Sequence, residues 1–262
     1  RDLVRSRGLG DVYKRQRNMA VDEAIMDGVI KGFSLPTIRF YDWNPPTVSC
    51  GYNQMISKEL NLTKVSEYGY GFVRRPTGGR LVLHEDEVTY SVISKCEGKL
   101  GGNVTESYFE ISKALAAGFK LMGIDVELEK GSLSSSQQRQ DMNPCFASSS
   151  RFDLNYKNKK IVGSAQVRRD GVLLQHGSIL LQHNQNRLAE LVPGLDEIKR
   201  ERLAAYLAKK TICINQILTK PISFSEATLN FAAGFQNTWN TDSFMVKYKL
   251  EKDEEILVKT YM

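Results

Sequence analysis

The sequence holds few of the residues that build metal centres. Among its 262 residues are three histidines and four cysteines, and no two cysteines form a Cys-x-x-Cys pair. Zinc sites need about four nitrogen or sulfur ligands at characteristic spacings, so we expect no metal. The cysteines are Cys50, Cys96, Cys145 and Cys213. In a reducing compartment we expect them to be free thiols.

Long apolar runs are also missing from the sequence. No stretch of about 18 apolar residues occurs, so we expect no membrane span or membrane partner. Residues 1–30 lack the order of basic, apolar and small residues that marks an export signal, and we expect a cytoplasmic protein. The composition of 41% hydrophobic and 25% charged residues provides enough apolar surface for a folded chain.

The net charge of +6 is unevenly distributed. Residues 1–17 hold six basic and two acidic residues, so this segment carries +4 of the total. Elsewhere the basic residues form no stripe with interleaved aromatic residues, and we expect no nucleic-acid partner. Residues 1–17 also have little apolar periodicity, so we interpret them as an extension outside the domain.

Helical and strand-like periodicities alternate along the rest of the chain. Capping residues and apolar spacing predict helices over residues 18–31, 57–68 and 105–122, and one that begins at the capping-box pattern Ser223-x-x-Glu226. Short apolar runs and turn residues predict strands over residues 37–41, 47–52, 71–75, 81–84 and 88–93. Residues 151–156, 160–168 and 172–181 are expected to form a three-stranded meander.

This order of elements predicts an α/β (α+β) fold, with a mixed β-sheet flanked by helices. We place the main domain over residues 18–185. A smaller helical portion is expected over residues 186–262, packed on the same domain. The Ser- and Gln-rich segment 131–143 is too polar to bury itself, so we expect a mobile surface loop there.

The first candidate site is the segment Arg-Arg-Pro-Thr-Gly-Gly-Arg at residues 74–80. Paired glycines allow the backbone to approach a ligand closely, and arginines bind carboxylates or phosphates. A plain hairpin turn has the same pattern.

The second candidate site is the predicted strand at residues 160–168. Alternation places Lys160, Val162, Ser164, Gln166 and Arg168 on one face. Because Gly163 and Ala165 on the reverse face permit close packing, we predict that the polar face borders a cavity. A solvated face is the alternative.

The third candidate is Cys145, which follows Pro144 at the end of the polar segment. A cysteine that is partly exposed and close to positive charge has more of the nucleophilic thiolate. The other three cysteines lie in apolar stretches and are expected to be buried. For His84 and His176 both a structural imidazole and a catalytic base remain open.

The motifs at residues 74–84, 87–92, 145–146, 160–168 and 174–179 together resemble the biotin/lipoate protein ligase family. The resemblance covers residues 18–185 and implies the fold of biotin ligases, a mixed sheet flanked by helices. Within the family the sequence is most similar to the LipM-type octanoyltransferases. These enzymes move an octanoyl group from acyl carrier protein to a lysine of a lipoyl domain, such as the glycine cleavage H protein.

Two features distinguish the sequence from the ATP-using ligases of this family. Arg80 stands where those ligases usually have a third glycine, and they need no nucleophilic cysteine. Cys145 occupies the position at which LipM-type enzymes carry theirs. The resemblance therefore implies an acyl intermediate on Cys145, no cofactor, and octanoyl-acyl carrier protein and a lipoyl domain as partners. Leu81 stands where the family commonly has a smaller residue, which leaves the preferred acyl length open.

The resemblance also assigns roles to individual residues. Lys160, the strand lysine of the family, holds the acyl carbonyl and favours the Cys145 thiolate. The substrate-binding residues are Arg75, Thr77, Gly78, Gly79, Arg80, His84, Gly163, Ser164 and Gln166. From strand placement Val73, Leu81, Leu83 and Val162 are candidates to line an acyl pocket, and core packing explains each of them equally well. From charge we expect Arg75, Arg80 and Arg168 to dock acidic carrier domains.

Three alternatives remain open. In an ATP-dependent lipoate ligase, Lys160 would bind an acyl-adenylate and Cys145 would be incidental. An amidotransferase would move octanoyl between lipoyl domains by the same acyl-cysteine. A non-catalytic acyl or biotin-like binding module would have kept the fold alone, but the joint presence of Cys145, Lys160 and the glycine pair argues against it.

Overall fold

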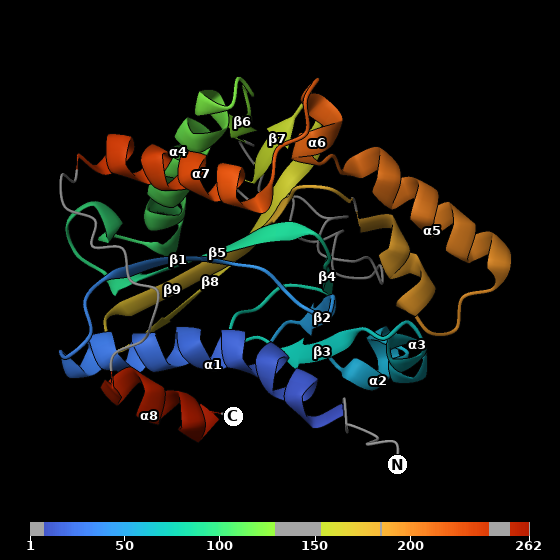
Figure 1. The fold of residues 1–262 in the computed structure, drawn as a ribbon, viewed down its shortest axis with the longest axis horizontal. Helices are drawn as coiled ribbons and strands as arrows, with labels where there is room; N and C mark the ends of the chain where they lie inside the picture. The colour runs from blue at the N-terminus through green and yellow to red at the C-terminus, as the bar shows by residue number, and fades with distance from the viewer. Residues whose placement is uncertain (1–7, 129–152, 184, 241–251, 262) are drawn as a thin grey trace, which may run out of the picture.

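Two β-sheets lie at the centre of the part of the chain that the structure describes (Figure 1). The computed structural model describes residues 8–128, 153–183, 185–240 and 252–261. The larger sheet has the strand order β1-β5-β9-β8-β7-β6 and the smaller one the order β3-β2-β4. In chain order the strands are β1 Thr37–Tyr41, β2 Thr47–Cys50, β3 Gly71–Arg74, β4 Val82–His84, β5 Glu87–Lys95, β6 Glu127–Leu128, β7 Leu154–Tyr156, β8 Lys159–Arg169 and β9 Val172–Leu180.

Each pair of neighbouring strands in the larger sheet is antiparallel. The expected meander is present, since β7 pairs with β8 and β8 pairs with β9. Its turns have positive φ at Lys157 and Asn158 and at Asp170 and Gly171. Two-residue turns of this kind match the right-handed twist of the strands, so they set the register of the meander. In the smaller sheet, β2 is parallel to β3 and antiparallel to β4.

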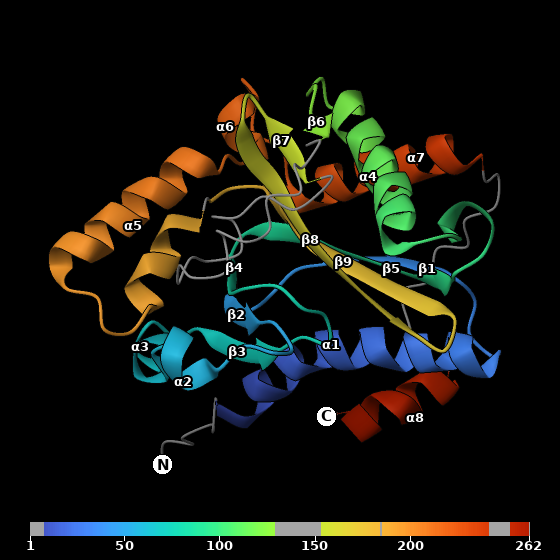
Figure 2. The same cartoon turned by 180° about the vertical axis from the view of Figure 1, so that it is seen from behind.

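Helices α4 (Val104–Leu121) and α7 (Phe224–Trp239) cover one face of the larger sheet (Figures 1 and 2). Each begins with a capping box, which Asn103 and Glu106 form in α4 and Ser223 and Glu226 form in α7. The predicted apolar stripe of α4 is confirmed as core, because Ile111, Leu115 and Phe119 are buried against α7 and the sheet. The Phe119 and Phe231 rings meet edge to face at 5.0 Å.

Helices α1 (Gly8–Lys31) and α8 (Lys252–Tyr261) lie on the opposite side of the larger sheet (Figure 2). Ala24, Ile25 and Val29 of α1 pack with Ile93 and Leu174 of the sheet. The helix predicted from residue 18 begins at Gly8, so it runs back into the segment that we interpreted as an extension. No helix in the described parts of the chain is long and apolar enough to cross a membrane.

Two short helices between β2 and β3 pack against the smaller sheet. A single helix was predicted over residues 57–68, but the structure has α2 (Ile56–Glu59) and α3 (Leu62–Glu67), because Leu60 is extended and Asn61 caps α3. Before α4 there is one turn of 3-10 helix, η1 (Gly98–Leu100). After β9 the chain is helical, as expected, with η3 (Gln185–Leu191), α5 (Glu197–Lys210) and α6 (Ile214–Ile217).

Alternation along the smaller sheet determines what borders its two faces. Val48 and Leu83 point to a core that also contains Leu188 and Leu191 of η3 and Leu207 of α5. Ser49, Val82 and His84 alternate with these two residues along their strands, so they face the larger sheet and line a cavity between the two sheets. The fold therefore encloses polar side chains between two layers of apolar core.

Candidate active site

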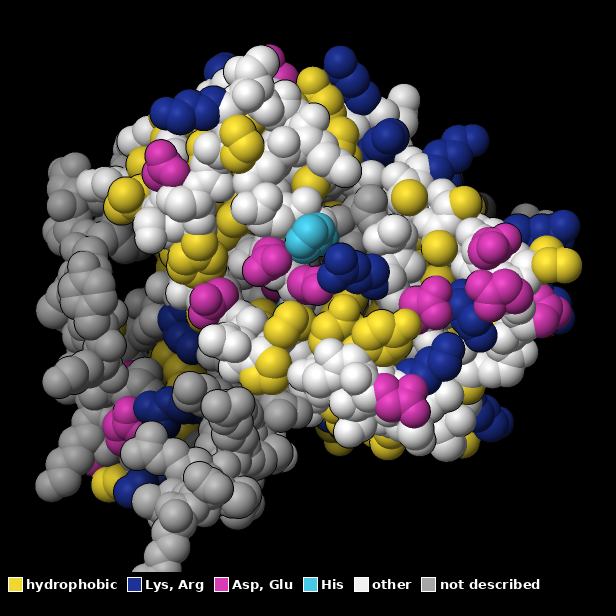
Figure 3. All heavy atoms as spheres, turned by 45° about the vertical axis from the view of Figure 1, so that its right-hand side comes forward, with side chains coloured by type: hydrophobic (Ala, Val, Ile, Leu, Met, Phe, Trp, Pro, Cys, Tyr) yellow, Lys and Arg dark blue, Asp and Glu magenta, His cyan; other side chains and the backbone are white. Residues whose placement is uncertain are grey.

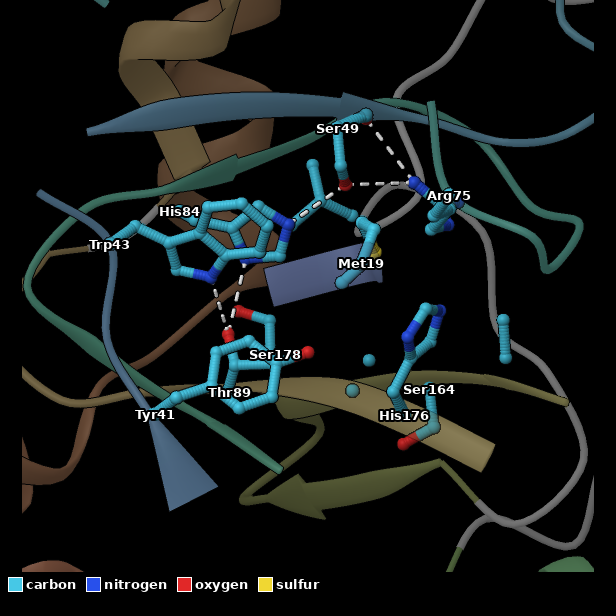
Figure 4. A pocket seen from close by; sticks show the side chains of 14 residues that line it. Met19, Tyr41, Trp43, Ser49, Arg75, His84, Thr89, Ser164, His176 and Ser178 are labelled. Atoms are coloured by element: carbon cyan, nitrogen blue, oxygen red, sulfur yellow. Dashed lines mark hydrogen bonds between the residues drawn. The ribbon is translucent and has the colours of Figure 1, made fainter. Parts of the chain in front are cut away.

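A cavity lies between the two sheets, beside α1 (Figure 4). Its apolar lining comes from Met19, Tyr41, Trp43, Val82 and Ala165, with Gly163 and Gly177 leaving space. Its polar lining comes from Ser49, Arg75, His84, Thr89, His176 and Ser178. The Ser178 hydroxyl is buried and has no hydrogen-bond partner among the described residues, so it is available to a bound molecule.

His84 lies in a hydrogen-bond chain on one wall of the cavity. Its Nδ1 lies 2.7 Å from Glu87 Oε1 and its Nε2 lies 2.8 Å from Ser49 Oγ, while its ring stacks on Trp43 at 4.6 Å. Arg75 donates to Ser49 Oγ at 3.0 Å. Because a guanidinium only donates and a carboxylate only accepts, the chain places the His84 proton on Nδ1 and lets Nε2 accept from Ser49.

Arg75 shapes the glycine loop at residues 76–80. Its guanidinium donates to the carbonyl of Gly78 at 2.9 and 3.1 Å and to the carbonyl of Arg80 at 2.7 Å. Arg75 is only 5% exposed, so the expectation that it lies on a docking surface is wrong. A Cβ on Gly51 would meet the Gly79 carbonyl oxygen at 2.1 Å, so only glycine there allows the loop to lie against β2.

His176 stands on β9 and joins the loop to α1. Its Nε2 lies 2.6 Å from Thr77 Oγ1, and its Nδ1 lies 3.6 Å from Asp22 Oδ2, longer than a hydrogen bond. Burial lowers the pKa of His176 below 6.5, its ordinary value. Burial also raises the pKa of Asp22, but Arg39 and His176 outweigh it and hold that pKa below its ordinary value.

Lys160 forms a buried ion pair that the sequence analysis did not foresee. Its Nζ lies 2.7 Å from Asp153 Oδ2, and the two side chains are 6% and 0% exposed. Tyr108 of α4 donates to the other oxygen of Asp153 at 3.2 Å. The pair therefore lies beside α4, at the start of the strand that also carries Gly163.

The polar face of β8 points away from the cavity, so the prediction that it borders one is wrong. Gln166 donates to Ser107 Oγ and Gln175 Oε1 at 3.0 and 2.9 Å, and Arg168 donates to the Gly102 carbonyl at 2.6 Å. The Ser164 hydroxyl, although Ser164 belongs to the lining, accepts from Tyr90 at 2.7 Å. The start of α4 supplies hydrogen-bond partners for Gln166 and Arg168 on this face. The small residues Gly163 and Ala165 on the reverse face leave space for the cavity.

The expected apolar lining was also assigned to the wrong faces. Leu81 and Leu83 pack in the core under η3, and Val162 packs in the core under α4 and α7. Val73 packs with Met19, Tyr41 and Trp43 beside the cavity but is not part of its lining. The structure thus places Arg75, His84, Gly163 and Ser164 in the lining of the cavity. Thr77, Gly78 and Arg80 are bound to the lining residues His176 and Arg75, and Lys160 and Gln166 lie on the α4 side.

Several functional candidates were missed from the sequence. Met19, Tyr41 and Trp43 reach the cavity only through tertiary folding and carry no local signal. Asp22 did carry one, because it lies three and seven residues before Ile25 and Val29, on the buried stripe of α1. A carboxylate on such a stripe requires partners.

The described cysteines are poor nucleophiles. Cys50 and Cys213 are fully buried, and burial raises the pKa of both thiols. Cys96 is half-buried and directly follows the last residue of β5. Thr89, the β5 residue that lines the cavity, lies near the other end of the strand. Cys145 and the polar segment 131–143 lie outside the described residues. In the described part of the chain, no three His, Cys, Asp or Glu side chains gather as a metal site.

Charges of both signs are mixed on the molecular surface near the smaller sheet. On the face in Figure 3, basic and acidic side chains are mixed across the middle of the view, and basic side chains predominate toward its upper right. Arg168 is bound to the start of α4, so of the three arginines expected to dock a partner only Arg80 keeps that assignment as an expectation.

Comparison with known proteins gives consistent matches. The model of the lipoyl protein ligase A/B catalytic domain matches residues 14–236. Proteins named octanoyltransferase LipM are similar over most of the chain. The one from Anoxybacillus flavithermus is 41% identical over 92% of this chain and 88% of its own length. The one from Bacillus subtilis is 40% identical over 90% of this chain and 86% of its own.

Solved structures of lipoate protein ligases share the fold. The bipartite lipoate protein ligase of Thermoplasma acidophilum superimposes with a TM-score of 0.77 at 22% identity, covering 94% of this chain and 87% of that one. A lipoate-protein ligase A bound with ATP gives a TM-score of 0.72 at 23% identity, covering 94% of this chain and 88% of that one. At such identities the likeness concerns the fold.

Proposed function

The chain belongs to the family of the lipoyl protein ligase A/B catalytic domain, and we propose that it transfers an octanoyl group from octanoyl-acyl carrier protein to a lysine of a lipoyl domain through an acyl-cysteine. The acceptor that we propose is a domain such as the glycine cleavage H protein. The octanoyltransferases that it resembles at about 40% identity make the chain an acyltransferase of lipoate assembly. The acyl-cysteine and the two protein partners are the proposed part.

What supports the acyl-cysteine route is the resemblance to the LipM-type octanoyltransferases, and the state of the described thiols supports the choice of Cys145 as the nucleophile. Cys50 and Cys213 are sealed in core with raised pKa values, and Cys96 lies away from the cavity. A nucleophilic cysteine must be accessible and ionisable. We therefore assign the nucleophile to Cys145.

The reaction proceeds in two exchanges at one carbonyl carbon. The Cys145 thiolate attacks the thioester of the donor, a new carbon–sulfur bond forms, and the carrier thiol leaves and takes up a proton. The acceptor lysine amine then attacks the acyl-cysteine, the carbon–nitrogen bond forms, the nitrogen gives up one proton to solvent, and Cys145 leaves as thiolate. The first exchange replaces one thioester by another and needs no ATP. The second forms an amide and drives the transfer.

Lys160 supplies the positive charge in this proposal. Its ammonium is almost fully buried, and charges in such surroundings act more strongly on their neighbours than charges in water. We assign it to holding the acyl carbonyl and favouring the thiolate of Cys145. The ion pair with Asp153, which also accepts a hydrogen bond from Tyr108, holds the Lys160 side chain in place.

The cavity is assigned to the acyl tail. Burying about seven methylenes at about 0.8 kcal/mol each gives a gross gain of about 5 to 6 kcal/mol. Met19, Trp43 and Val82 supply apolar contact area. The loop of Thr77, Gly78 and Gly79 adjoins the lining residue Arg75, and we assign it to the reacting end, with its amides or those of Gly163 and Ser164 as oxyanion donors.

Intact mass spectrometry after incubation with octanoyl-acyl carrier protein tests the proposal. Wild type is expected to gain the mass of one octanoyl group, Cys145→Ala to gain none, and the matched control Cys96→Ala to behave as wild type. An adduct on Cys145→Ala would assign the nucleophile to another residue, and transfer of free octanoate with ATP by this variant would establish the ligase alternative. Octanoyl H protein as the better donor would establish an amidotransferase.

A further inference from the structure

The glycine loop is held from two sides of the cavity. Arg75 binds the carbonyls of Gly78 and Arg80 from the side of the smaller sheet. Thr77, which is fully buried, binds His176 of the larger sheet through its hydroxyl. Figure 4 shows His176 across the cavity from Ser49 and Arg75. The bond between Thr77 and His176 therefore ties the start of the loop to the opposite sheet.

The surroundings of His176 determine the direction of that bond. The Asp22 carboxylate faces Nδ1 at 3.6 Å and is itself held by Tyr41 at 2.9 Å and Ser91 at 2.8 Å, and by Arg39. A proton on Nδ1 is favoured by the carboxylate, so Nε2 accepts the hydroxyl proton of Thr77. Burial lowers the pKa of His176, which keeps the ring in this uncharged form.

The order carboxylate, imidazole and hydroxyl resembles that of a hydrolase triad, but the geometry does not fit a nucleophilic threonine. Thr77 has no exposed surface, and it is not among the residues that line the cavity. Its hydroxyl is directed at His176, and its carbonyl accepts from the Tyr52 amide at 2.9 Å. Both polar groups of Thr77 thus fix the loop in place and neither meets a substrate.

We propose that Thr77 is a positioning residue, which through His176 fixes the peptide groups of Gly78 and Gly79 against the acyl group. The role of the loop in acyl contact rests on the proposed function. The anchoring of the loop rests only on the contacts of Thr77 and His176.

Two Thr77 variants separate the hydroxyl from the shape of the side chain. Thr77→Val keeps the branched shape and removes the hydroxyl, whereas Thr77→Ser keeps the hydroxyl. His176→Phe keeps a planar ring but removes the acceptor from the other side, and it serves as the second variant where Thr77→Val does not fold. His183→Phe is the matched control, because the His183 side chain is 44% exposed and lies outside the cavity.

The measurements are amide hydrogen exchange over residues 77–81 and the kcat and KM for octanoyl transfer from carrier protein. For Thr77→Val and His176→Phe we expect loop exchange about tenfold faster and kcat about tenfold lower, with KM within about twofold of wild type. Thr77→Ser is expected to restore both values, and His183→Phe to leave both unchanged.

Each result decides a distinct point. Loop exchange at the wild-type rate in Thr77→Val and His176→Phe overturns the anchoring, whatever the reaction is. Faster exchange with unchanged kcat overturns the positioning role. If wild type forms no octanoyl adduct, the proposed function fails, while the exchange data still decide whether Thr77 anchors the loop.

Discussion

The ammonium of Lys160 lies 2.7 Å from the carboxylate of Asp153, and both side chains are almost completely buried. A buried ion pair contributes little net stability, but removal of one partner leaves an uncompensated charge in a poorly solvated site. Variants of this pair can therefore separate the effect of the Lys160 charge on protein stability from its effect on catalysis.

Asp153→Asn is expected to lower the free energy of unfolding by about 3 kcal/mol, because the Lys160 ammonium then lacks its counter-charge. The double variant Asp153→Asn, Lys160→Met is expected to regain most of that stability and to form no octanoyl adduct. Urea unfolding and intact mass measure the two effects. Lys113→Met, in the exposed pair with Glu110, is the control and should unfold as wild type. Acylation of the double variant would remove Lys160 from the mechanism.

Thiol labelling tests the assignment of the nucleophile. Because burial raises the pKa of Cys50 and Cys213, iodoacetamide at pH 7.5 is expected to leave both unmodified in the folded protein and to modify them in urea. Modification of Cys145 is expected to abolish transfer, and prior incubation with octanoyl-acyl carrier protein to protect it. Peptide mapping identifies the sites. Protection of Cys96 in place of Cys145 would contradict the assignment.

The pH dependence of stability should report His176. The pKa of His176 in the folded protein lies below 6.5, its ordinary value in the unfolded chain. Between these two pKa values the unfolded chain binds a proton that the folded chain does not. The stabilisation is complete above pH 6.5 and is lost as pH falls through this window, with a slope of at most about 1.4 kcal/mol per pH unit. His176→Gln is expected to flatten the slope between pH 7 and 5.5 in urea titrations. His183→Gln should retain it, and an unchanged slope in His176→Gln would show that another group is responsible.

These expectations depend on details that the sequence could predict only in part. The alternation along β8 was predicted correctly, because it follows from strand geometry alone. Which face borders the cavity was not, because that depends on what packs behind it. Gln166 looked like a cavity residue until α4 supplied Ser107, and Leu83 looked like one until η3 supplied a core.

The residues of the candidate site were likewise predictable from the sequence only in part. The motifs identified His84 and the loop that holds Thr77, since chemistry and local turns leave a pattern in the chain. Asp22 and Asp153, which support His176 and Lys160, come from distant segments and meet their partners only in the folded protein. Single buried carboxylates of this kind are visible as polar residues in apolar stretches, but their partners are not.

Filling the cavity from β8 tests whether it holds the acyl tail. Ala165 faces the cavity, so Ala165→Leu would occupy space that we assign to the distal methylenes. Each excluded methylene removes about 0.8 kcal/mol of burial, so the loss of two or more lowers octanoyl transfer by more than about tenfold. Butyryl transfer, whose chain ends earlier, is expected to change by less than about twofold. The measurement is the transfer rate from octanoyl- and butyryl-carrier protein, with Ala205→Leu on the exposed side of α5 as the control. An equal fall with both donors would mean that the substitution disturbs the fold or the reacting end, and that the tail lies elsewhere.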